Sequence, residues 1–418
     1  MKKKLLAALL ASALAAGMLP ASACAASDYT TASATFVTLT DSSATAKGKY
    51  TGYEIDGTDV SITAAGTYVF SGDCDDGSIT VKKGVTGVTI VLNGLTLTND
   101  DSAAITLNKT AEASLIAAAG TTNTVADTEG SNDENAAVKV KSGAALAIGG
   151  TGTLTVDGNA KNGIKGAADA VITVAEVKLN INAANDGLSC DDELNITGGT
   201  LSITAGGDAV KASPDTGDTG NPDTTSLGNV TISGGTLTLA TGDDGVHADN
   251  DLVIGTKGAS STSTPRINIT ASYEGLEGTT VTVYSGDIDV VASDDGVNAA
   301  NSTLGERSDK YAINIAGGDL YIDAGSDGLD SNNDINITGG KVEVYGADAM
   351  MDAAIDYDGT FTLSGGTLFG AGMEPSAGMQ ALRSRAATMN IRSRCWPSTK
   401  PSRATTRQAG RSARMRRL

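Results

Sequence analysis

Aromatic residues are scarce in this 418-residue chain, which has 1 Trp, 10 Tyr and 4 Phe against 52 Gly. Aromatic side chains bury the largest areas in compact cores, so this composition disfavours a single compact core and favours a long array of repeats. The 4 cysteines are too few and too scattered for the disulfide framework of a small exported domain. We therefore expect Cys190 to be a small buried residue.

Basic residues are also scarce, with 30 Lys and Arg against 49 Asp and Glu. The stretch from Met373 to the end contains 10 of the 12 arginines and only one acidic residue, Glu374, so the rest of the chain is still more acidic. This charge is expected to repel nucleic acid and anionic membranes and to attract cations. We expect no nucleic-acid partner.

Long hydrophobic runs are absent except at the start, where Lys2–Lys4 precede an apolar run from Leu5 to Leu19 and then small residues. This order is typical of a signal peptide, which we assign to residues 1–25. The run is short for a membrane span and no second one follows, so no transmembrane segment is expected. Cys24 lies in a loose lipoprotein-like box. The predicted location is extracellular or at the cell surface, with a lipid anchor on Cys24 as an alternative to simple cleavage.

Asp-Gly dipeptides recur along the chain and define a period. Asp186 and Asp208 are 22 residues apart, and longer intervals are explained by polar insertions such as SPDTGDTGNPDTTS. The series continues at Asp244, Glu274, Asp295, Asp327 and Asp348.

Each unit contains three short runs in which apolar residues alternate with polar ones. In one unit they are Leu188/Cys190, Leu194/Ile196 and Leu201/Ile203. A period of two places each pair on one face of a strand. Three strands and three corners in about 22 residues predict an all-β fold, a single-stranded right-handed parallel β-helix with one unit per coil. A β-sandwich or propeller is the alternative. Glycine is expected at the corners because tight bends often need positive φ.

The β-helix is assigned to residues 60–370, and residues 26–59 are expected to form an N-terminal leader or cap. Residues 371–418 form a basic tail without glycine-punctuated strands. An abrupt change of composition of this kind is typical of translation in a shifted reading frame. The alternative is a basic arm that binds an acidic polymer or envelope.

Stacking of the coils aligns the acidic corner residues in one column. Like charges roughly 4.8 Å apart repel by about 1 kcal/mol in water, so the column needs raised pKa values, screening or bound cations. Oxygen ligands in flexible turns suit Ca²⁺. The alternative is that Asp and Asn only stabilise the turns by hydrogen bonds to the backbone. The candidate metal ligands are Asp208, Asp243, Asp244, Asp294, Asp295, Asp327 and Asp330.

The outer face of the strand after each corner carries a polar residue in every coil. This row could lie along an extended polysaccharide; the alternative is an ordinary solvated face. The candidate carbohydrate-binding residues are Ser189, Lys211, His247, Glu277 and Asn298. We find no partner set that would make His247 a catalyst, so it is expected at most beside the metal site.

The runs AAGTYVFSG, VLNGLTLTNDDSAAI, AANDGLSCDDELNITGGTLSITAGGDAVKAS and SDGLDSNNDINITGGKVEV are similar to those of a known family. The chain resembles, from about Val60 to Gly370, bacterial secreted carbohydrate-binding proteins with a polysaccharide-lyase-like right-handed parallel β-helix. The resemblance implies bound calcium and binding of plant cell-wall polysaccharides, cellulose or acidic pectic chains, without established catalysis. Asp243, Asp244 and His247 resemble the calcium cluster of related pectate lyases, and Ala209 departs from the corner glycine.

The leading hypothesis is a secreted, calcium-binding, carbohydrate-binding protein. The alternative is a calcium-dependent pectate-type lyase, in which Lys211, or second Lys165, would be the base. Against a lyase, Arg266 and Arg307 lie in or beside insertions, away from the row. A third hypothesis is a structural or adhesive surface protein.

Overall fold

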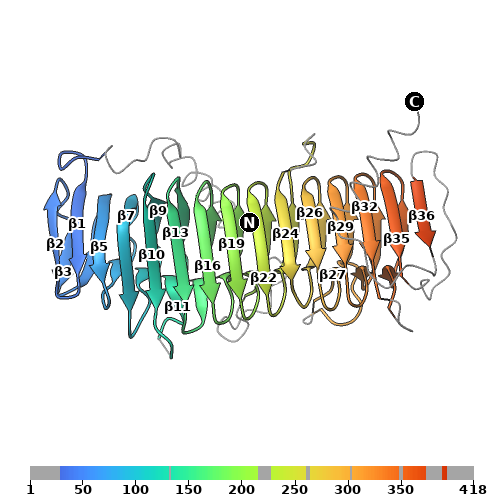
Figure 1. Ribbon diagram of the computed structural model, residues 1–418, viewed down its shortest axis with the longest axis horizontal. Helices are drawn as coiled ribbons and strands as arrows, with labels where there is room; N and C mark the ends of the chain where they lie inside the picture. The colour runs from blue at the N-terminus through green and yellow to red at the C-terminus, as the bar shows by residue number, and fades with distance from the viewer. Residues whose placement is uncertain are drawn as a thin grey trace.

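The computed structural model describes residues 29–130, 133–214, 227–259, 264–301, 304–347, 352–372 and 388–392. Within these ranges the chain forms β-strands and no helix, so the prediction of an all-β fold is confirmed. The strands stack along one long axis (Figure 1). Pairing is parallel throughout the stack, and the antiparallel pairs are β1–β2 and β3–β4 at the N-terminal end. The fold is β-helix-like.

Most strands in the body of the stack pair with the strand three places further along the chain, as β10 does with β13 and β11 with β14. Around the long strands β23 and β25 the partner is two places further along, as in β22–β24 and β24–β26. Three series of strands result. The first series consists of β4 (Asp59–Ile62), β6 (Ile79–Val81), β8 (Ile105–Leu107), β11 (Ala136–Val140), β14 (Asn162–Gly166), β17 (Leu188–Cys190), β20 (Val210–Ala212), β27 (Val297–Ala299), β30 (Leu329–Ser331) and β33 (Ile355–Tyr357). The second series consists of β9 (Glu112–Ala117), β12 (Ala145–Gly150), β15 (Val171–Val174), β18 (Glu193–Ile196), β21 (Asn229–Ile232), β28 (Ala312–Ile315), β31 (Asp334–Ile337) and β34 (Phe361–Leu363).

The third series consists of β10 (Thr122–Asp127), β13 (Thr153–Gly158), β16 (Lys178–Ala183), β19 (Thr200–Ala205), β22 (Thr236–Thr241), β24 (Arg266–Ala271), β26 (Asp287–Val291), β29 (Asp319–Asp323), β32 (Lys341–Tyr345), β35 (Thr367–Ala371) and β36 (Thr388–Arg392). Four longer strands continue from one series into the next: β5 (Gly66–Cys74), β7 (Val88–Asn99), β23 (Val246–Ile254) and β25 (Leu276–Val283).

The N-terminal end contains β1 (Thr35–Thr40), β2 (Ser43–Gly48) and β3 (Tyr53–Asp56). β1 pairs with β2 in a hairpin and, on its other side, in parallel with β5. The segment predicted as a leader or cap therefore continues the sheet. At the other end, β36 lies in the predicted basic tail and pairs in parallel with β35.

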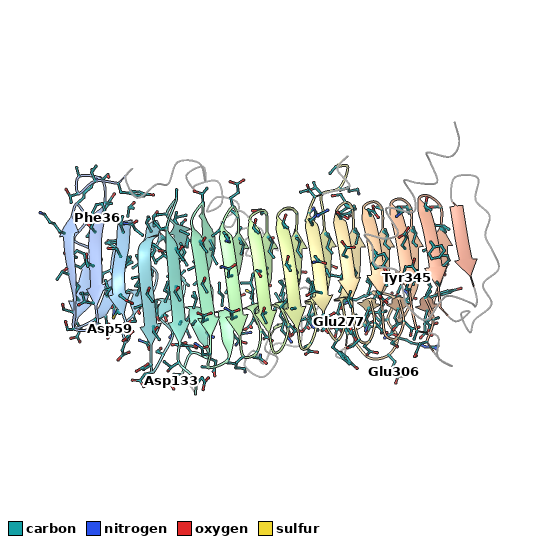
Figure 2. The ribbon with its side chains drawn as sticks, in the orientation of Figure 1. Phe36, Asp59, Asp133, Glu277, Glu306 and Tyr345 are labelled. Carbon is teal, nitrogen blue, oxygen red and sulfur yellow. The ribbon has the colours of Figure 1, made fainter. Side chains whose placement is uncertain are left out.

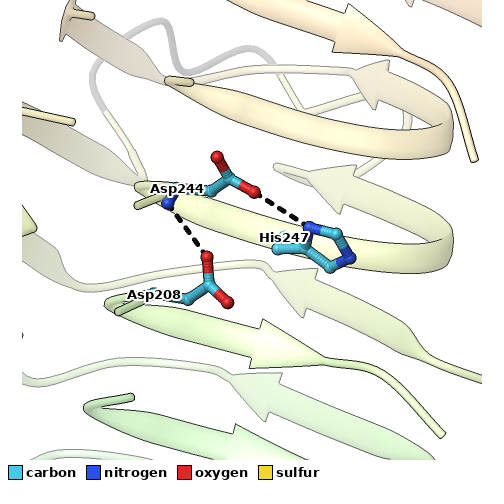
Figure 3. Close-up of side chains that lie close together, drawn as sticks. All are labelled: Asp208, Asp244 and His247. Atoms are coloured by element: carbon cyan, nitrogen blue, oxygen red, sulfur yellow. Dashed lines mark hydrogen bonds and ion pairs between the residues drawn. The ribbon is translucent and has the colours of Figure 1, made fainter. Parts of the chain in front are cut away.

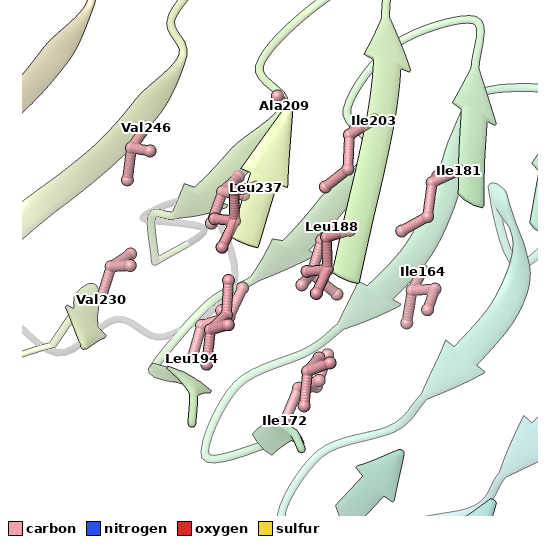
Figure 4. Packing of buried hydrophobic residues seen from close by; sticks show 14 of the residues in the cluster. Ile164, Ile172, Ile181, Leu188, Leu194, Ile203, Ala209, Val230, Leu237 and Val246 are labelled. Carbon is pink, nitrogen blue, oxygen red and sulfur yellow. The ribbon is translucent and has the colours of Figure 1, made fainter. Parts of the chain in front are cut away.

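The interior is built from the aliphatic pairs that alternate along each strand. Leu188, Leu194 and Ile203 have at most 1% of their surface exposed. Residues at equivalent positions of neighbouring repeats stack on one another (Figure 4). Together they form one contiguous apolar cluster from Val37 to Leu368. Burial of each such side chain contributes about 1.5–3 kcal/mol, which explains how the chain is stable with few aromatics.

The corner glycines follow a different rule from the one expected. The glycine that follows the corner acid, as at Gly187, Gly245, Gly296 and Gly328, does not adopt positive φ; that conformation occurs at the second glycine of several Gly-Gly pairs, such as Gly199 with φ 91°. At Gly187, an added Cβ would lie 2.4 Å from Cγ2 of Ile203 and 2.7 Å from the carbonyl oxygen of Ala209. The Asp-Gly glycine is therefore required by close packing.

Ala209 replaces this glycine in one repeat, and the packing partner differs there too. An added Cβ at Gly187 would clash with Ile203, and one at Gly245 would clash with Ile269; both isoleucines belong to the third series. In the Ala209 repeat, Leu239 occupies the position that pairs with Ile203 and Ile269. Leucine branches at Cγ and has no Cγ2 methyl on Cβ, which leaves room for the alanine Cβ.

Cys190 is buried and free, as expected, and so is Cys74. No helix in the described part of the chain is long and apolar enough to cross a bilayer. The predicted signal peptide and Cys24 lie outside the described residues, as does the basic tail except for 371–372 and β36.

Candidate functional site

The outward-facing residues of the first strand series lie in register from repeat to repeat. We call this set the outer row. It consists of Lys139, Lys165, Ser189, Lys211, His247, Glu277, Asn298, Asp330 and Asp356. The charge of the row changes along its length, from lysines in the N-terminal half to carboxylates in the C-terminal half. Glu277, labelled in Figure 2, begins the acidic half, and His247 lies at the junction.

The acidic corner residues form a second line beside the outer row, which we call the acidic column. It consists of Asp186, Asp208, Asp244, Glu274, Asp295 and Asp327. Carboxylates of this column accept hydrogen bonds from the backbone of the next repeat: the N–H of Asp208 donates to Asp186 Oδ1 (3.2 Å) and that of Asp244 to Asp208 Oδ1 (2.9 Å). The second contact is drawn in Figure 3. The column thus has a structural role between repeats, because each of its aspartates accepts a hydrogen bond from a backbone N–H of the next repeat.

Two lysines of the outer row, Lys165 and Lys211, form ion pairs with acidic residues. Lys165 Nζ lies 2.7 Å from Asp191 Oδ1 and 3.2 Å from Ser189 Oγ. Lys211 forms an ion pair with Asp208. Burial opposes the charge of Lys211, but Asp208 outweighs it and raises the pKa of Lys211. A general base acts in its deprotonated form, which a lowered pKa would favour.

Ser189 has no exposed surface, so a ligand on this face would contact its lysine neighbours instead. Lys139 is half-buried beside Lys165 on the adjacent strand. Burial and the charge of Lys165 lower the pKa of Lys139. Two adjacent lysines on one face are well suited to bind an anion.

His247 lies among three carboxylates. Its Nδ1 is 2.9 Å from Asp244 Oδ2 and also contacts Glu277, while its Nε2 is 2.8 Å from Asp249 Oδ1. Burial opposes protonation of His247, but the hydrogen bonds with Asp244, Asp249 and Glu277 outweigh it and raise the pKa of His247 well above its usual value. None of these three partners was predicted from the sequence; they come from the repeat of His247 and from the next one.

Glu274 and Asn298 extend this cluster. Burial, together with the charges of Glu277 and Asp244, raises the pKa of Glu274 to about 9. The Nδ2 of Asn298 donates to both Glu274 carboxylate oxygens at 3.1 Å. Asn298 is 7% exposed, and its Oδ1 is buried without a hydrogen-bond partner. A buried acceptor without a partner is costly, so this oxygen is available to a bound water or ion.

The C-terminal half of the site is rich in carboxylates, and Arg307 pairs with Asp358, one of those that act on Asp330. Burial and the neighbouring aspartates raise the pKa of Asp327 to about 7 and that of Asp330 to about 8. Burial also raises the pKa of Asp295. Asp327 accepts a hydrogen bond from the N–H of Ala353, which occupies the corresponding corner position in the next repeat.

The predicted metal ligands are therefore not gathered at one point. Among the described residues, three ligand atoms lie within 4.8 Å of one another in two groups, Asp208–Asp244–His247 and Asp244–Glu274–Glu277. Asp243 is exposed and Asp294 is half-buried next to Tyr273. Asp295, Asp327 and Asp330 lie further along the column and row. Sequence reasoning missed Asp249 and Glu277 as partners of His247, although Asp249 shares its strand face by alternation.

The sequence of this chain matches a known protein family. The model of the family described as "Carbohydrate-binding domain-containing protein" matches residues 56–306 and 266–369. The chain belongs to this family, and the resemblance inferred from the sequence is confirmed.

Two relatives illustrate the match. A carbohydrate-binding domain-containing protein of Acetivibrio thermocellus is 32% identical over 136 residues, which are 31% of this chain and 47% of the relative. The chain thus spans less than half the length of that relative. A solved structure, that of a polysaccharide lyase-like protein from C. thermocellum as a gadolinium derivative, aligns with 24% identity and a TM-score of 0.48 over 68% of this chain and 97% of the other.

Proposed function

We propose that this protein is exported and binds acidic plant cell-wall polysaccharides along the outer row, with calcium at its acidic half. The observation that carries the proposal is the in-register row itself, which changes from lysines to carboxylates. Strands in a parallel stack are spaced by about 4.8 Å, so the row offers a regular series of charges to an extended chain. Uronate carboxylates would pair with the lysines, and cations would bridge them to the carboxylates.

The finer description of the fold is part of this proposal. We infer a coil of three strands in about 22 residues, and the pairing of strand n with strand n+3 supports it. Right-handedness follows from the strong preference of parallel crossover connections for that hand.

Asp330 and Asn298 are the residues that we propose hold calcium. They are register partners in the outer row, and Asp295 and Asp327 lie in the adjacent column. The orphaned Oδ1 of Asn298 fits an oxygen-binding dication, because calcium accepts amide and carboxylate oxygens alike. When bound, calcium would neutralise the aspartates. Asp208, Asp243, Asp244 and Asp294 would add negative charge to the same edge.

Asp330→Asn tests the calcium site, since it removes the carboxylate that calcium would bind and keeps the side-chain shape. We expect calcium affinity, measured by isothermal titration calorimetry, to fall at least tenfold. Asp309→Asn is the matched control, because Asp309 is an exposed aspartate outside the row and the column. Equal calcium affinity in the wild type and in Asp330→Asn would contradict the site.

Acidic chains suit this surface better than cellulose does. Binding of a neutral glucan relies on flat aromatic faces, and Tyr273 is the one large aromatic among the described residues that is substantially exposed, at 50%. Cellulose binding is kept as the alternative ligand, to be measured in the same experiment.

A pectate-type lyase is the alternative activity. It would need an unprotonated lysine near the calcium, and the pKa of Lys139, not that of Lys211, is lowered by burial and by Lys165. Arg266 is paired with Asp287 and Arg307 with Asp358, so neither is placed on the outer row. A structural or adhesive role needs only the stack of strands.

One experiment separates these functions. The purified protein is incubated with polygalacturonate or with cellulose, in calcium or in chelator, and both pull-down and the absorbance of unsaturated products are measured. We expect calcium-dependent retention on polygalacturonate without product. Product formation would identify a lyase, and absence of both binding and product would favour the structural or adhesive role.

A further inference from the structure

Tyr273 lies at a corner of the stack and is the most exposed large hydrophobic side chain among the described residues, at 50%. It lies between β24, which ends at Ala271, and β25, which begins at Leu276. Its backbone N–H donates to the carbonyl oxygen of Asp243 (2.7 Å), and its own carbonyl oxygen accepts the N–H of Asp294 (2.9 Å). These bonds align Tyr273 with the same corner position of the repeats before and after it.

The other residues at this corner position are small or polar. Successive backbone hydrogen bonds of the same kind connect Asn185, Gly207, Asp243, Tyr273, Asp294 and Ser326. Tight turns favour Asn, Asp, Gly and Ser, because these residues adopt turn conformations or bond to the nearby backbone. Turn formation therefore explains the other five residues but does not explain the tyrosine.

The ring of Tyr273 is held in one direction and is open to a ligand. A hydrogen bond between its hydroxyl group and the side chain of Asp294 raises the pKa of Tyr273 and directs the ring toward the next repeat. Gly242 in the repeat before and Ser293 in the repeat after are small and exposed. A flat molecule is therefore not kept from the ring by bulky neighbours at these two positions.

A second exposed apolar side chain belongs to the same corner. Val291, at the end of β26, is 45% exposed, and its carbonyl oxygen accepts a hydrogen bond of 3.2 Å from Oγ of Ser272, the residue before Tyr273. The register of β24 against β22 shifts by one residue just before this corner, and such bulges re-aim the side chains near them. The corner thus adds a small apolar surface to the aromatic ring.

The charges beside the ring distinguish between sugar units. The chain belongs to a carbohydrate-binding family, and pyranose rings have apolar C–H faces that pack on aromatic rings. Asp243 and Asp294 lie on either side of Tyr273 along the corner line. Their carboxylates repel an anionic uronate but accept hydrogen bonds from the hydroxyl groups of a neutral sugar.

We propose that Tyr273 is a stacking subsite for a neutral pyranose unit, separate from the lysines of the outer row. The inference rests on the proposed function and deepens it, because it assigns the neutral alternative ligand to a place of its own on the molecule. Contact with the ring needs no ion pair and no calcium. Binding at Tyr273 is therefore expected to persist in chelator and in added salt, which weakens ionic contacts.

The full-length protein is titrated by calorimetry with cellopentaose, a soluble chain of neutral pyranoses, in the presence of chelator. Tyr273→Ser is the test variant, because Ser326 occupies the same corner position two repeats later. We expect it to weaken cellopentaose binding about fivefold or more, as truncation of a contact tyrosine does. Tyr273→Phe keeps the ring and should retain most of the affinity. Ile55→Ala, which removes an exposed apolar side chain near the N-terminal end, is the control and should leave the affinity unchanged.

Nitration of Tyr273 by tetranitromethane, located by peptide mapping, gives a second measurement that needs no variant. Saturating cellopentaose should slow this nitration. The inference is overturned if the wild type binds no cellopentaose, if folded Tyr273→Ser binds it as tightly as the wild type, or if Tyr273→Phe loses as much affinity as Tyr273→Ser. Unchanged nitration in cellopentaose would also overturn it.

Polygalacturonate in calcium is the separate probe of the proposed function, and Tyr273→Ser should bind it as the wild type does. Failure of the wild type to bind polygalacturonate would contradict the acidic ligand and leave the subsite at Tyr273 standing. Failure to bind cellopentaose alone would contradict the subsite and leave the acidic ligand standing, so the two failures are distinguishable.

Discussion

The backbone N–H of Asp244 donates a hydrogen bond of 2.9 Å to Oδ1 of Asp208, one repeat earlier in the chain. This bond explains why an acceptor side chain recurs before the corner glycine. Asn162 does the same further upstream, where its Oδ1 accepts the N–H of Asp186 at 3.1 Å. The acceptor atom, and not the charge, is what the stacking of repeats requires.

Replacement of Asp208 tests this requirement. Asp208→Ala leaves the N–H of Asp244 buried without a partner and should lower the free energy of unfolding by about 1–3 kcal/mol. Asp208→Asn keeps the acceptor, loses only the ion pair with Lys211 and should cost clearly less. Urea unfolding with unchanged m-values measures both. Equal losses for the two variants would contradict a hydrogen-bonding role.

The packing rule at the corners predicts the cost of a single methyl group. At Gly296, an added Cβ would lie 2.2 Å from Cγ2 of Ile322 and 2.6 Å from the carbonyl oxygen of Gly328. Gly296→Ala should therefore destabilise the protein by about 1–3 kcal/mol through overpacking. Gly198→Ala is the control, because its nearest neighbouring atom is 3.7 Å away.

Leucine at the facing position should relieve the same clash. We expect Gly187→Ala to be destabilising alone and partly rescued by Ile203→Leu, since Ala209 and Leu239 already form this combination. Thermal unfolding of the two single variants and the double variant measures the coupling. Strictly additive effects would show that the shape of the facing side chain does not matter.

The basic half of the outer row predicts where an acidic polysaccharide binds. Lys165→Gln and Lys139→Gln should each weaken polygalacturonate binding by up to about fivefold, because exposed ion pairs contribute at most about 1 kcal/mol. Added salt should weaken wild-type binding and reduce the difference between wild type and variants. Lys178→Gln, on the exposed face of the third series, should leave binding unchanged. Identical losses for all three variants would indicate a general charge effect.

Burial of Cys190 predicts how its reaction with iodoacetamide depends on pH. Burial raises the pKa of the Cys190 thiol to about 11, and its side chain has no exposed surface. The thiolate that reacts with iodoacetamide is thus absent at pH 9. Peptide mapping should find Cys190 unmodified at pH 7 and at pH 9 in the native protein, and modified after denaturation with guanidinium. Modification of native Cys190 that rises steeply from pH 7 to pH 9 would contradict the burial.

Most of the fold and the order of residues in the outer row could be predicted from the periodicity of the sequence. Alternation with a period of two decides which face of a strand is apolar, and the spacing of the Asp-Gly dipeptides aligns the repeats. Ser189, Lys211 and His247 therefore lie in adjacent, paired positions, as predicted. The register depends only on local patterns that repeat along the chain.

The contacts of individual side chains could not be predicted from the sequence in the same way. The reason for the corner glycine was mistaken, because a clash with Ile203 depends on how the third series packs over the first. The burial of Ser189 under Lys165, and the pairing of Lys211 with Asp208, depend on rotamers of long side chains. Calcium, export and the polysaccharide remain predictions.

The sequence by itself determined an acidic, repetitive, all-β chain and which residues lie on one line, because these follow from composition and spacing. The tertiary structure alone decided which charges neutralise one another. His247 shows the difference: alternation places it outward, but only the stacking of repeats brings Glu277 to its Nδ1, while Asp249 takes its Nε2. Such a cluster depends on distances across neighbouring strands, which a linear pattern does not contain.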